Sequence, residues 1–158
     1  MSFETIRYEA AGPVATITLD RPERLNTIVP PMPDEVEAAV GRAVRDPEVK
    51  VIVVRGAGRA FCAGYDFGDG FKHWGEALET DGRWDPGKDF AFATAHEVAP
   101  TQKFMSVWRS PKPVIAQVHG YCVGDSRGAV AITKSLPGSQ RPSVSSASPQ
   151  CLKPPPKS

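Results

Sequence analysis

The chain has 158 residues, and its 19 Lys and Arg against 18 Asp and Glu give a formal net charge of +1. The basic residues near the C-terminus are dispersed among Ser and Pro without interleaved aromatic residues, which argues against a nucleic-acid-binding protein. Its length has room for one ordinary domain, and no stretch reaches the roughly 20 apolar residues that a membrane helix needs. The three cysteines form no Cys-x-x-Cys pair and are odd in number, which favours a reducing compartment over a disulfide framework or a cysteine metal cluster. We therefore expect a soluble, cytoplasmic protein without a metal.

The composition of the chain changes near Gly124. Residues 124–158 contain five Lys and Arg, a single Asp, six of the 16 prolines, eight serines and no aromatic residue. Such a segment buries too little apolar surface to offset the entropy lost on ordering it. We predict one folded domain over residues 1–124 and a Pro/Ser-rich segment over residues 125–158, disordered from about Pro137.

The first elements in chain order are predicted by the periodicity of apolar residues. Residues 3–9 and 14–19 alternate apolar and polar side chains around an Ala-Gly-Pro turn, which predicts an antiparallel hairpin. Apolar residues then recur at spacings of three and four up to Asp46-Pro47, which predicts a helix over 34–45 with Pro33 near its start.

The next elements are two short apolar strands separated by a loop and a helix. The β-branched run 49–54 predicts a strand covered on both faces, and residues 113–118 predict a second one. Five glycines mixed with aromatic residues favour a loop over residues 66–89. The stretch 90–109 favours a helix that Pro100 kinks or divides. The order of elements indicates an α/β fold of repeated sheet and helix layers.

A glycine-containing turn follows each of the two predicted apolar strands. Residues 59–66 have the sequence Arg-Ala-Phe-Cys-Ala-Gly-Tyr-Asp, and residues 119–124 have the sequence His-Gly-Tyr-Cys-Val-Gly. A tight turn at the end of a strand exposes backbone N–H groups, which enzymes use to bind developing negative charge. The two turns together therefore predict part of an active site.

These turns, the segment Arg-Pro-Glu-Arg-Leu-Asn at residues 21–26 and the segment at 111–120 together resemble the crotonase superfamily, that is, the enoyl-CoA hydratase/isomerase family. The four motifs occur in the family's order and spacing, over residues 3–124, approximately the N-terminal half of a family member. The resemblance implies a spiral of repeated ββα turns, truncated here, and assembly as a homo-trimer. It also implies an acyl-CoA thioester as substrate, with coenzyme A as part of that substrate and no other cofactor.

The resemblance further implies two backbone N–H groups that polarise the thioester carbonyl. The first belongs to Tyr65, and the second to the residue after Gly124, which is Asp125 where the family has a Gly-rich turn. Hydratases also use two carboxylates, and Gly128 stands at the position of one while no counterpart of the other is visible. The leading hypothesis is a truncated family protein, of lyase and isomerase lineage, with little or no hydratase activity.

The substrate contacts that the resemblance implies lie in the same motifs. Arg24 is placed along the pantetheine and phosphates of coenzyme A, and Ala63, Gly64, Asp66 and Gly124 border the pocket together with Tyr65. Recognition of coenzyme A can persist where catalysis does not. The alternative hypothesis is therefore a non-catalytic protein that binds acyl-CoA or associates with full-length family subunits.

Several residues near these motifs have simpler interpretations than catalysis. A short carboxylate after a turn usually satisfies free N–H groups, so we expect Asp66 to cap the following segment rather than to act as an acid or base. Cys62 is expected to be a small buried hydrophobe, and we disfavour a thiol nucleophile with His96 or His119 as its base. His119 is expected to form a local hydrogen bond.

The loop offers two further alternatives that the residues leave open. Trp74 and Trp84 are suited equally to packing and to a lid over a ligand. Glu76 and Glu79 of the loop could replace the missing carboxylates, an interpretation that we disfavour.

Overall fold

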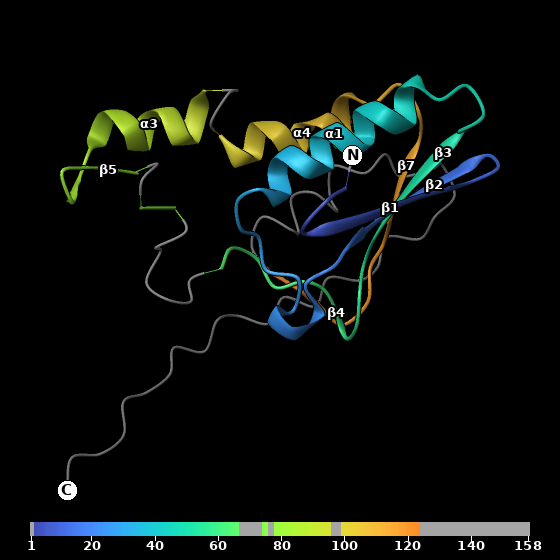
Figure 1. The fold of residues 1–158 in the computed structure, drawn as a ribbon, viewed down its shortest axis with the longest axis horizontal. Coiled ribbons are helices and arrows are strands. Elements are labelled where there is room, and N and C mark those ends of the chain that lie inside the picture. Colours follow the sequence, from blue (N-terminus) through green and yellow to red (C-terminus); the bar gives the residue numbers. More distant parts are fainter. Residues whose placement is uncertain (1, 67–73, 76–77, 96–98, 124–158) are drawn as a thin grey trace, which may run out of the picture.

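The computed structural model describes residues 2–66, 74–75, 78–95 and 99–123. Its centre is a four-stranded sheet with the strand order β1-β2-β3-β7 (Figure 1). The strands β1 (Ile6–Ala11) and β2 (Val14–Leu19) form an antiparallel hairpin, whereas β3 (Val51–Gly56) and β7 (Val114–Gln117) continue the sheet in parallel. The predicted hairpin and both predicted apolar strands are confirmed, and β3 begins two residues later than its pattern suggested.

Two helices cover one face of this sheet. Helix α1 (Met32–Arg45) connects β2 to β3, helix α4 (Pro100–Arg109) precedes β7, and the two pack against each other (Figure 1). Crossovers between parallel strands of one sheet require such connecting segments. The buried core between helices and sheet includes Ile17, Ile52 and Val114 from the strands and Val36 and Val40 from α1.

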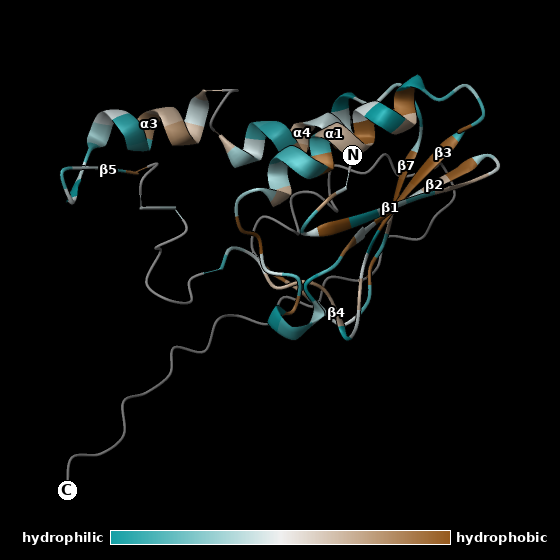
Figure 2. Ribbon diagram, in the orientation of Figure 1, coloured by the Kyte–Doolittle hydropathy of each residue, from teal (hydrophilic) through white to brown (hydrophobic). Residues whose placement is uncertain are grey.

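The two faces of β3 differ in burial. Apolar colouring follows β2, β3 and β7, while α1 and α4 carry much hydrophilic colouring (Figure 2). Ile52 and Val54 of β3 are buried under the helices, but their neighbours Val51 and Val53 are only half-buried. The prediction that this strand is covered equally on both faces is therefore wrong for the part of the chain that the structure describes, where the helices lie on one face.

A second, smaller sheet joins the ends of the long strands. The strand β4 (Ala60–Cys62) follows β3, the strand β8 (Tyr121–Cys122) follows β7, and the two short strands pair in parallel. After β2, the 3-10 turn η1 (Pro22–Arg24) leads to Ile28, which forms an isolated bridge with Tyr65. Each of β2, β3 and β7 is thus followed by a short segment in a second layer, which is the repeated ββα pattern that we predicted.

The region predicted as a loop contains regular structure. The strands β5 (Glu79–Thr80) and β6 (Arg83–Trp84) form a small hairpin, and α3 (Pro86–Thr94) begins within the predicted loop. Pro86 occupies the first turn of α3, where its missing N–H costs nothing. Pro100 occupies the first turn of α4, so the expected division of the 90–109 helix is confirmed. The predicted segment 125–158 lies outside the described residues.

Asp85 caps the N-terminus of α3. Its carboxylate accepts hydrogen bonds from the N–H groups of Gly87 at 2.8 Å and Lys88 at 3.2 Å, and from the Thr80 hydroxyl at 2.7 Å. The hydrogen bond from Thr80, followed by those from the two N–H groups, holds the pKa of Asp85 below its ordinary value. Within the described ranges, no helix is both long and apolar enough to cross a membrane.

The cap predicts a pH dependence for α3. Because the folded-state pKa of Asp85 is lowered, its contribution to stability is fully present above the unfolded pKa and is lost as the pH falls through the folded pKa. We expect faster exchange of the Gly87 and Lys88 amide hydrogens at acid pH than at neutral pH, after correction for intrinsic exchange rates. Asp85→Asn is the matched control, since asparagine caps without titrating. The same acid response in this variant would contradict the prediction.

Candidate functional site

Two hydrogen bonds in the turn after β4 fix the orientation of the Tyr65 backbone. The Ile28 N–H donates to the carbonyl of Gly64 at 2.8 Å, and the Asp66 N–H donates to the carbonyl of Ile28 at 2.9 Å. In a parallel bridge the residue between these two partners directs its own N–H and C=O to the opposite side. The Tyr65 N–H therefore points away from Ile28. Gly64 has a φ of 93°, a conformation that residues with a Cβ rarely adopt.

The side chain of Asn26, in the turn after β2, binds the backbone of the connection between β3 and β4. Its side chain is 0% exposed, and its amide nitrogen donates to the carbonyls of Ala57 and Ala60 at 2.8 Å and of Phe61 at 3.2 Å. Its amide oxygen accepts the N–H of Arg21 at 2.9 Å. Asn26 itself has a φ of 54°, which asparagine tolerates better than most residues. One side chain thus ties the connection between β3 and β4 to the turn after β2.

Asp66 is joined to the same turn by an ion pair. Its Oδ2 accepts from the Arg21 guanidinium at 3.2 and 3.3 Å and from the Thr27 hydroxyl at 2.9 Å. Arg21 also donates to the carbonyl of Thr27 at 2.7 Å. The carboxylate is mostly buried and its charge is compensated by Arg21. The segment that Asp66 was predicted to cap lies outside the described residues, and within them Asp66 serves as a tie to the turn after β2.

The second predicted turn begins beside the first. The Val123 N–H donates to the carbonyl of Cys62 at 3.0 Å, next to the pairing of β4 with β8. The chain that enters Gly124 is therefore adjacent to the strand that leads into Ala63 and Tyr65. Gly124, Asp125 and Gly128 lie outside the described residues. The structure thus brings the start of the second turn to the first one without describing the second donor.

Arg24 lies on the surface at the same end of the molecule. It ends η1 and its side chain is exposed, while Leu25, with a φ of 53°, turns the chain inward toward Asn26. The Ala63 N–H donates to the carbonyl of Leu25 at 3.0 Å. This hydrogen bond connects the Arg24 turn directly to the Ala63–Asp66 segment. Arg24 and the predicted pocket residues are therefore parts of one local structure.

Trp74 packs against this structure from the next segment. Its ring lies edge-on to those of Tyr65, at a centroid distance of 5.6 Å, and of Phe92 in α3, at 5.3 Å. Trp74 is 4% exposed, whereas Trp84 is 63% exposed. Of the two open interpretations, packing is confirmed for Trp74. Trp84 lies on the exposed hairpin β5–β6.

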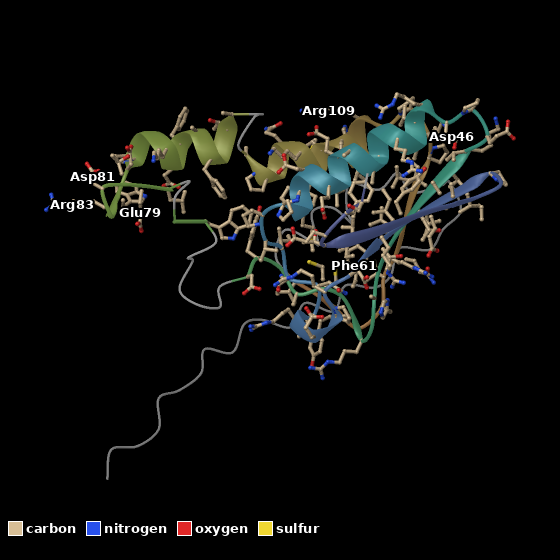
Figure 3. The ribbon with its side chains drawn as sticks, viewed as in Figure 1. Asp46, Phe61, Glu79, Asp81, Arg83 and Arg109 are labelled. Carbon is tan, nitrogen blue, oxygen red and sulfur yellow. The ribbon has the colours of Figure 1, made fainter. Side chains whose placement is uncertain are left out.

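The remaining candidates have structural partners or lie elsewhere. Cys62 is buried, with its sulfur 4.0 Å from the carbonyl of Gly64. The His119 ring donates to the carbonyl of Gly58 at 2.8 Å, a partner 61 residues away in sequence, so its hydrogen bond is structural but not local as we expected. Glu79 lies on the β5–β6 hairpin, at the far end of the molecule from Phe61 in β4 (Figure 3). His96 and Glu76 are outside the described residues, and the described part contains no group of three or more His, Cys, Asp or Glu suited to a metal.

Comparisons with known proteins agree with this architecture. Residues 9–130 match the family described as enoyl-CoA hydratase/isomerase. A probable enoyl-CoA hydratase of Rhodobacter capsulatus is 40% identical over 124 residues, which are 78% of this chain and 42% of the relative. The 1,2-epoxyphenylacetyl-CoA isomerase of Escherichia coli is 32% identical over 111 residues, 70% of this chain and 38% of that protein.

Solved structures give the same result for the fold. An enoyl-CoA hydratase from Mycobacterium smegmatis has a TM-score of 0.69 and 34% identity, and the match covers 84% of this chain and 46% of that one. An enoyl-CoA hydratase/isomerase from Xanthobacter autotrophicus has a TM-score of 0.63 and 35% identity, with 84% and 45% covered.

The chain is therefore a member of the enoyl-CoA hydratase/isomerase family and has the α/β crotonase fold. It spans less than half the length of these relatives and solved structures. The match with the family ends at residue 130, and the domain boundary at 124 stays a prediction.

The geometry predicts that Asn26 is essential to the fold of this site. Asn26→Asp keeps the shape of the side chain but replaces the donating nitrogen by an oxygen that faces three carbonyls. Leaving these carbonyls without a donor lowers the free energy of unfolding by about 3 kcal/mol or more. Urea unfolding followed by tryptophan fluorescence measures the loss.

Gln102→Glu in α4 is the control for the Asn26 variant. It makes the same change from amide to carboxylate, and its oxygen still accepts from Arg109. We expect nearly unchanged stability for this control. Equal unfolding midpoints for the two variants would contradict the role assigned to Asn26.

Proposed function

We propose that the protein binds an acyl-CoA thioester and polarises its carbonyl with the Tyr65 N–H. The observation that carries the proposal is the orientation of Tyr65. Its neighbours Gly64 and Asp66 hydrogen-bond to Ile28, so its own N–H points to the other side of the strand. The position corresponds to that of the first oxyanion donor in the family motif. A backbone donor fixed by its neighbours undergoes no reorganisation when negative charge develops on the carbonyl oxygen.

The surrounding residues support the same site. Asn26 and the Arg21–Asp66 ion pair hold the turn on one side, and the Trp74 ring contacts Tyr65 on another. Arg24 is exposed on the turn connected to Ala63, where a long cationic side chain suits the phosphates of coenzyme A. The acyl group would then lie near Tyr65 and the nucleotide near Arg24.

The second half of the proposal concerns the reaction. Hydration of an unsaturated thioester needs groups that activate water and protonate the α-carbon, and Gly128 stands where the family motif has one of these carboxylates. Removal of one oxyanion donor costs about a hundredfold to a thousandfold in rate, and the position of the second donor is Asp125. We therefore propose acyl-CoA binding with little or no hydratase activity.

Tyr65→Pro tests the proposed donor, because proline has no N–H. We expect butyryl-CoA affinity, measured by isothermal titration calorimetry, to fall about tenfold, the loss of one hydrogen bond to an oxygen. Tyr65→Phe is the control, since it alters the side chain and retains the N–H. Circular dichroism confirms that both variants are folded. A proline variant that is folded and binds as well as wild type would contradict the role of this N–H.

The predicted lack of hydration has its own test. Incubation of wild-type protein with crotonyl-CoA, followed by chromatography of the thioesters, should show bound but unconverted substrate. Sustained formation of 3-hydroxybutyryl-CoA that is lost in Tyr65→Pro and retained in Tyr65→Phe would show catalysis at this site. That result would overturn the second half of the proposal and leave the first intact.

A further inference from the structure

A row of polar side chains crosses the sheet on the face away from the helices. In the register of the sheet, Arg7 of β1 lies opposite Thr18 of β2, Thr18 opposite Arg55 of β3, and Arg55 opposite Gln117 of β7. Tyr8, the neighbour of Arg7, places its ring 4.6 Å from the Arg42 guanidinium of α1. Because side chains alternate along a strand, Arg7 and the rest of the row project from the opposite face.

This row lines a cavity of about 330 Å³. The loop of residues 56–58 and the side chain of His119 form the rest of the lining. The Nε2 of His119 donates to the carbonyl of Gly58 at 2.8 Å, so the loop is fixed to the segment that follows β7. The volume lies at the lower end of the usual range for ligand pockets, about 300–1,000 Å³.

The charged side chains that line the cavity are Arg7 and Arg55. Two arginines and no carboxylate belong to the lining. Arg55 donates through Nε to the Thr18 hydroxyl at 3.0 Å, and Arg7 pairs through Nε with Asp20 at 2.8 Å. Within the described part of the chain, neither guanidinium makes a hydrogen bond through its terminal nitrogens. The Nε contacts orient the two planar groups, and their terminal donors remain available for an anion.

We propose that this cavity is a binding site for a phosphate group, carried by inorganic phosphate or by a small phosphomonoester. The paired donors of two guanidinium groups match the geometry of a phosphate group, and the charge of Arg55 has no carboxylate paired with it among the described residues. The Gln117 amide and the Thr18 hydroxyl add neutral polar groups at the wall of the cavity. The cavity shares no lining residue with the Tyr65 turn, and the proposal is independent of acyl-CoA binding.

The test measures stabilisation of the full chain by anions. Inorganic phosphate and glycerol 3-phosphate are titrated separately at constant ionic strength, with chloride and acetate as comparison anions, and the unfolding midpoint is recorded. A ligand that binds the folded state raises this midpoint in a saturable manner. We expect saturation with at least one of the two phosphate compounds. The compound that binds more tightly shows whether the site takes inorganic phosphate or a phosphomonoester. An equal response to chloride or acetate would overturn the proposal.

Variants locate the effect. Arg55→Gln is expected to weaken phosphate binding roughly tenfold, and Arg55→Lys, which keeps the charge without the paired donors, is expected to weaken it less. Arg83→Gln removes the same charge from the exposed hairpin at the far end of the molecule and should leave binding unchanged (Figure 3). Circular dichroism establishes whether each variant is folded. If Arg55→Gln is not folded, Arg55→Lys alone tests the role of Arg55 in phosphate binding.

Two outcomes of the variant experiment would contradict the proposal. One is unchanged phosphate affinity in the folded Arg55 variants. The other is a parallel loss of phosphate and butyryl-CoA affinity in Arg55→Gln, which would mean that the cavity belongs to the acyl-CoA site. Reduced phosphate affinity with retained butyryl-CoA affinity in Arg55→Gln supports a separate site. If wild-type protein binds phosphate but not butyryl-CoA, only the proposed function is contradicted.

Discussion

The fold of the candidate site depends on one buried amide, that of Asn26. Its nitrogen contacts the carbonyls of Ala57, Ala60 and Phe61, which are 31–35 residues away in sequence. A carbonyl buried without a donor is costly, so the connection between β3 and β4 is stable in this path only with a donor on the facing turn. The path of this connection determines where β4 ends, and hence where Tyr65 lies.

The periodic elements of the fold could be predicted from the sequence because their signals are local. The alternation in β1 and β2 and the three-to-four spacing in α1 reflect burial of one side of each element. The strands β5 and β6 have two residues each and are too short for any period. The start of α3 had a usable signal in Asp85-Pro86, an N-cap followed by proline, which the many glycines nearby obscured.

The site was predictable in part, and for a different reason. Tyr65 and Ala63 were found because a family motif contains them, and Gly64 also because its turn needs a positive φ. Arg21 and Asn26 belong to a family motif that assigns no role to either side chain, and Thr27 lies just outside that motif. Their partners are distant in the chain, and backbone carbonyls have no sequence signature. Only the folded chain shows that Asp66 closes an ion pair with Arg21 instead of serving its own turn alone.

The row of polar side chains across the sheet could not be predicted from the sequence, for a related reason. Thr18 and Arg55 are 37 residues apart, and only the register of the sheet aligns them. In sequence, Arg55 is the one charged residue at the end of an apolar run, which is typical of a strand that reaches the surface. A shift of one residue in register would move it to the helix-covered face. Among the described residues, the helices α1 and α4 lie on the opposite face, and this face therefore accommodates charged side chains.

The segment between β3 and β4 separates the two proposed binding regions. Gly56 lines the cavity, and a Cβ at this position would lie 2.2 Å from the carbonyl oxygen of Ala60 and 2.4 Å from that of Phe61. The backbone here is packed directly on backbone, and two of the carbonyls involved are those that Asn26 holds. Such close packing leaves no room for the backbone of this segment to shift by a small amount. A ligand in the cavity would therefore shift the Tyr65 turn only by breaking the Asn26 hydrogen bonds, which is why the two regions are expected to bind their ligands independently.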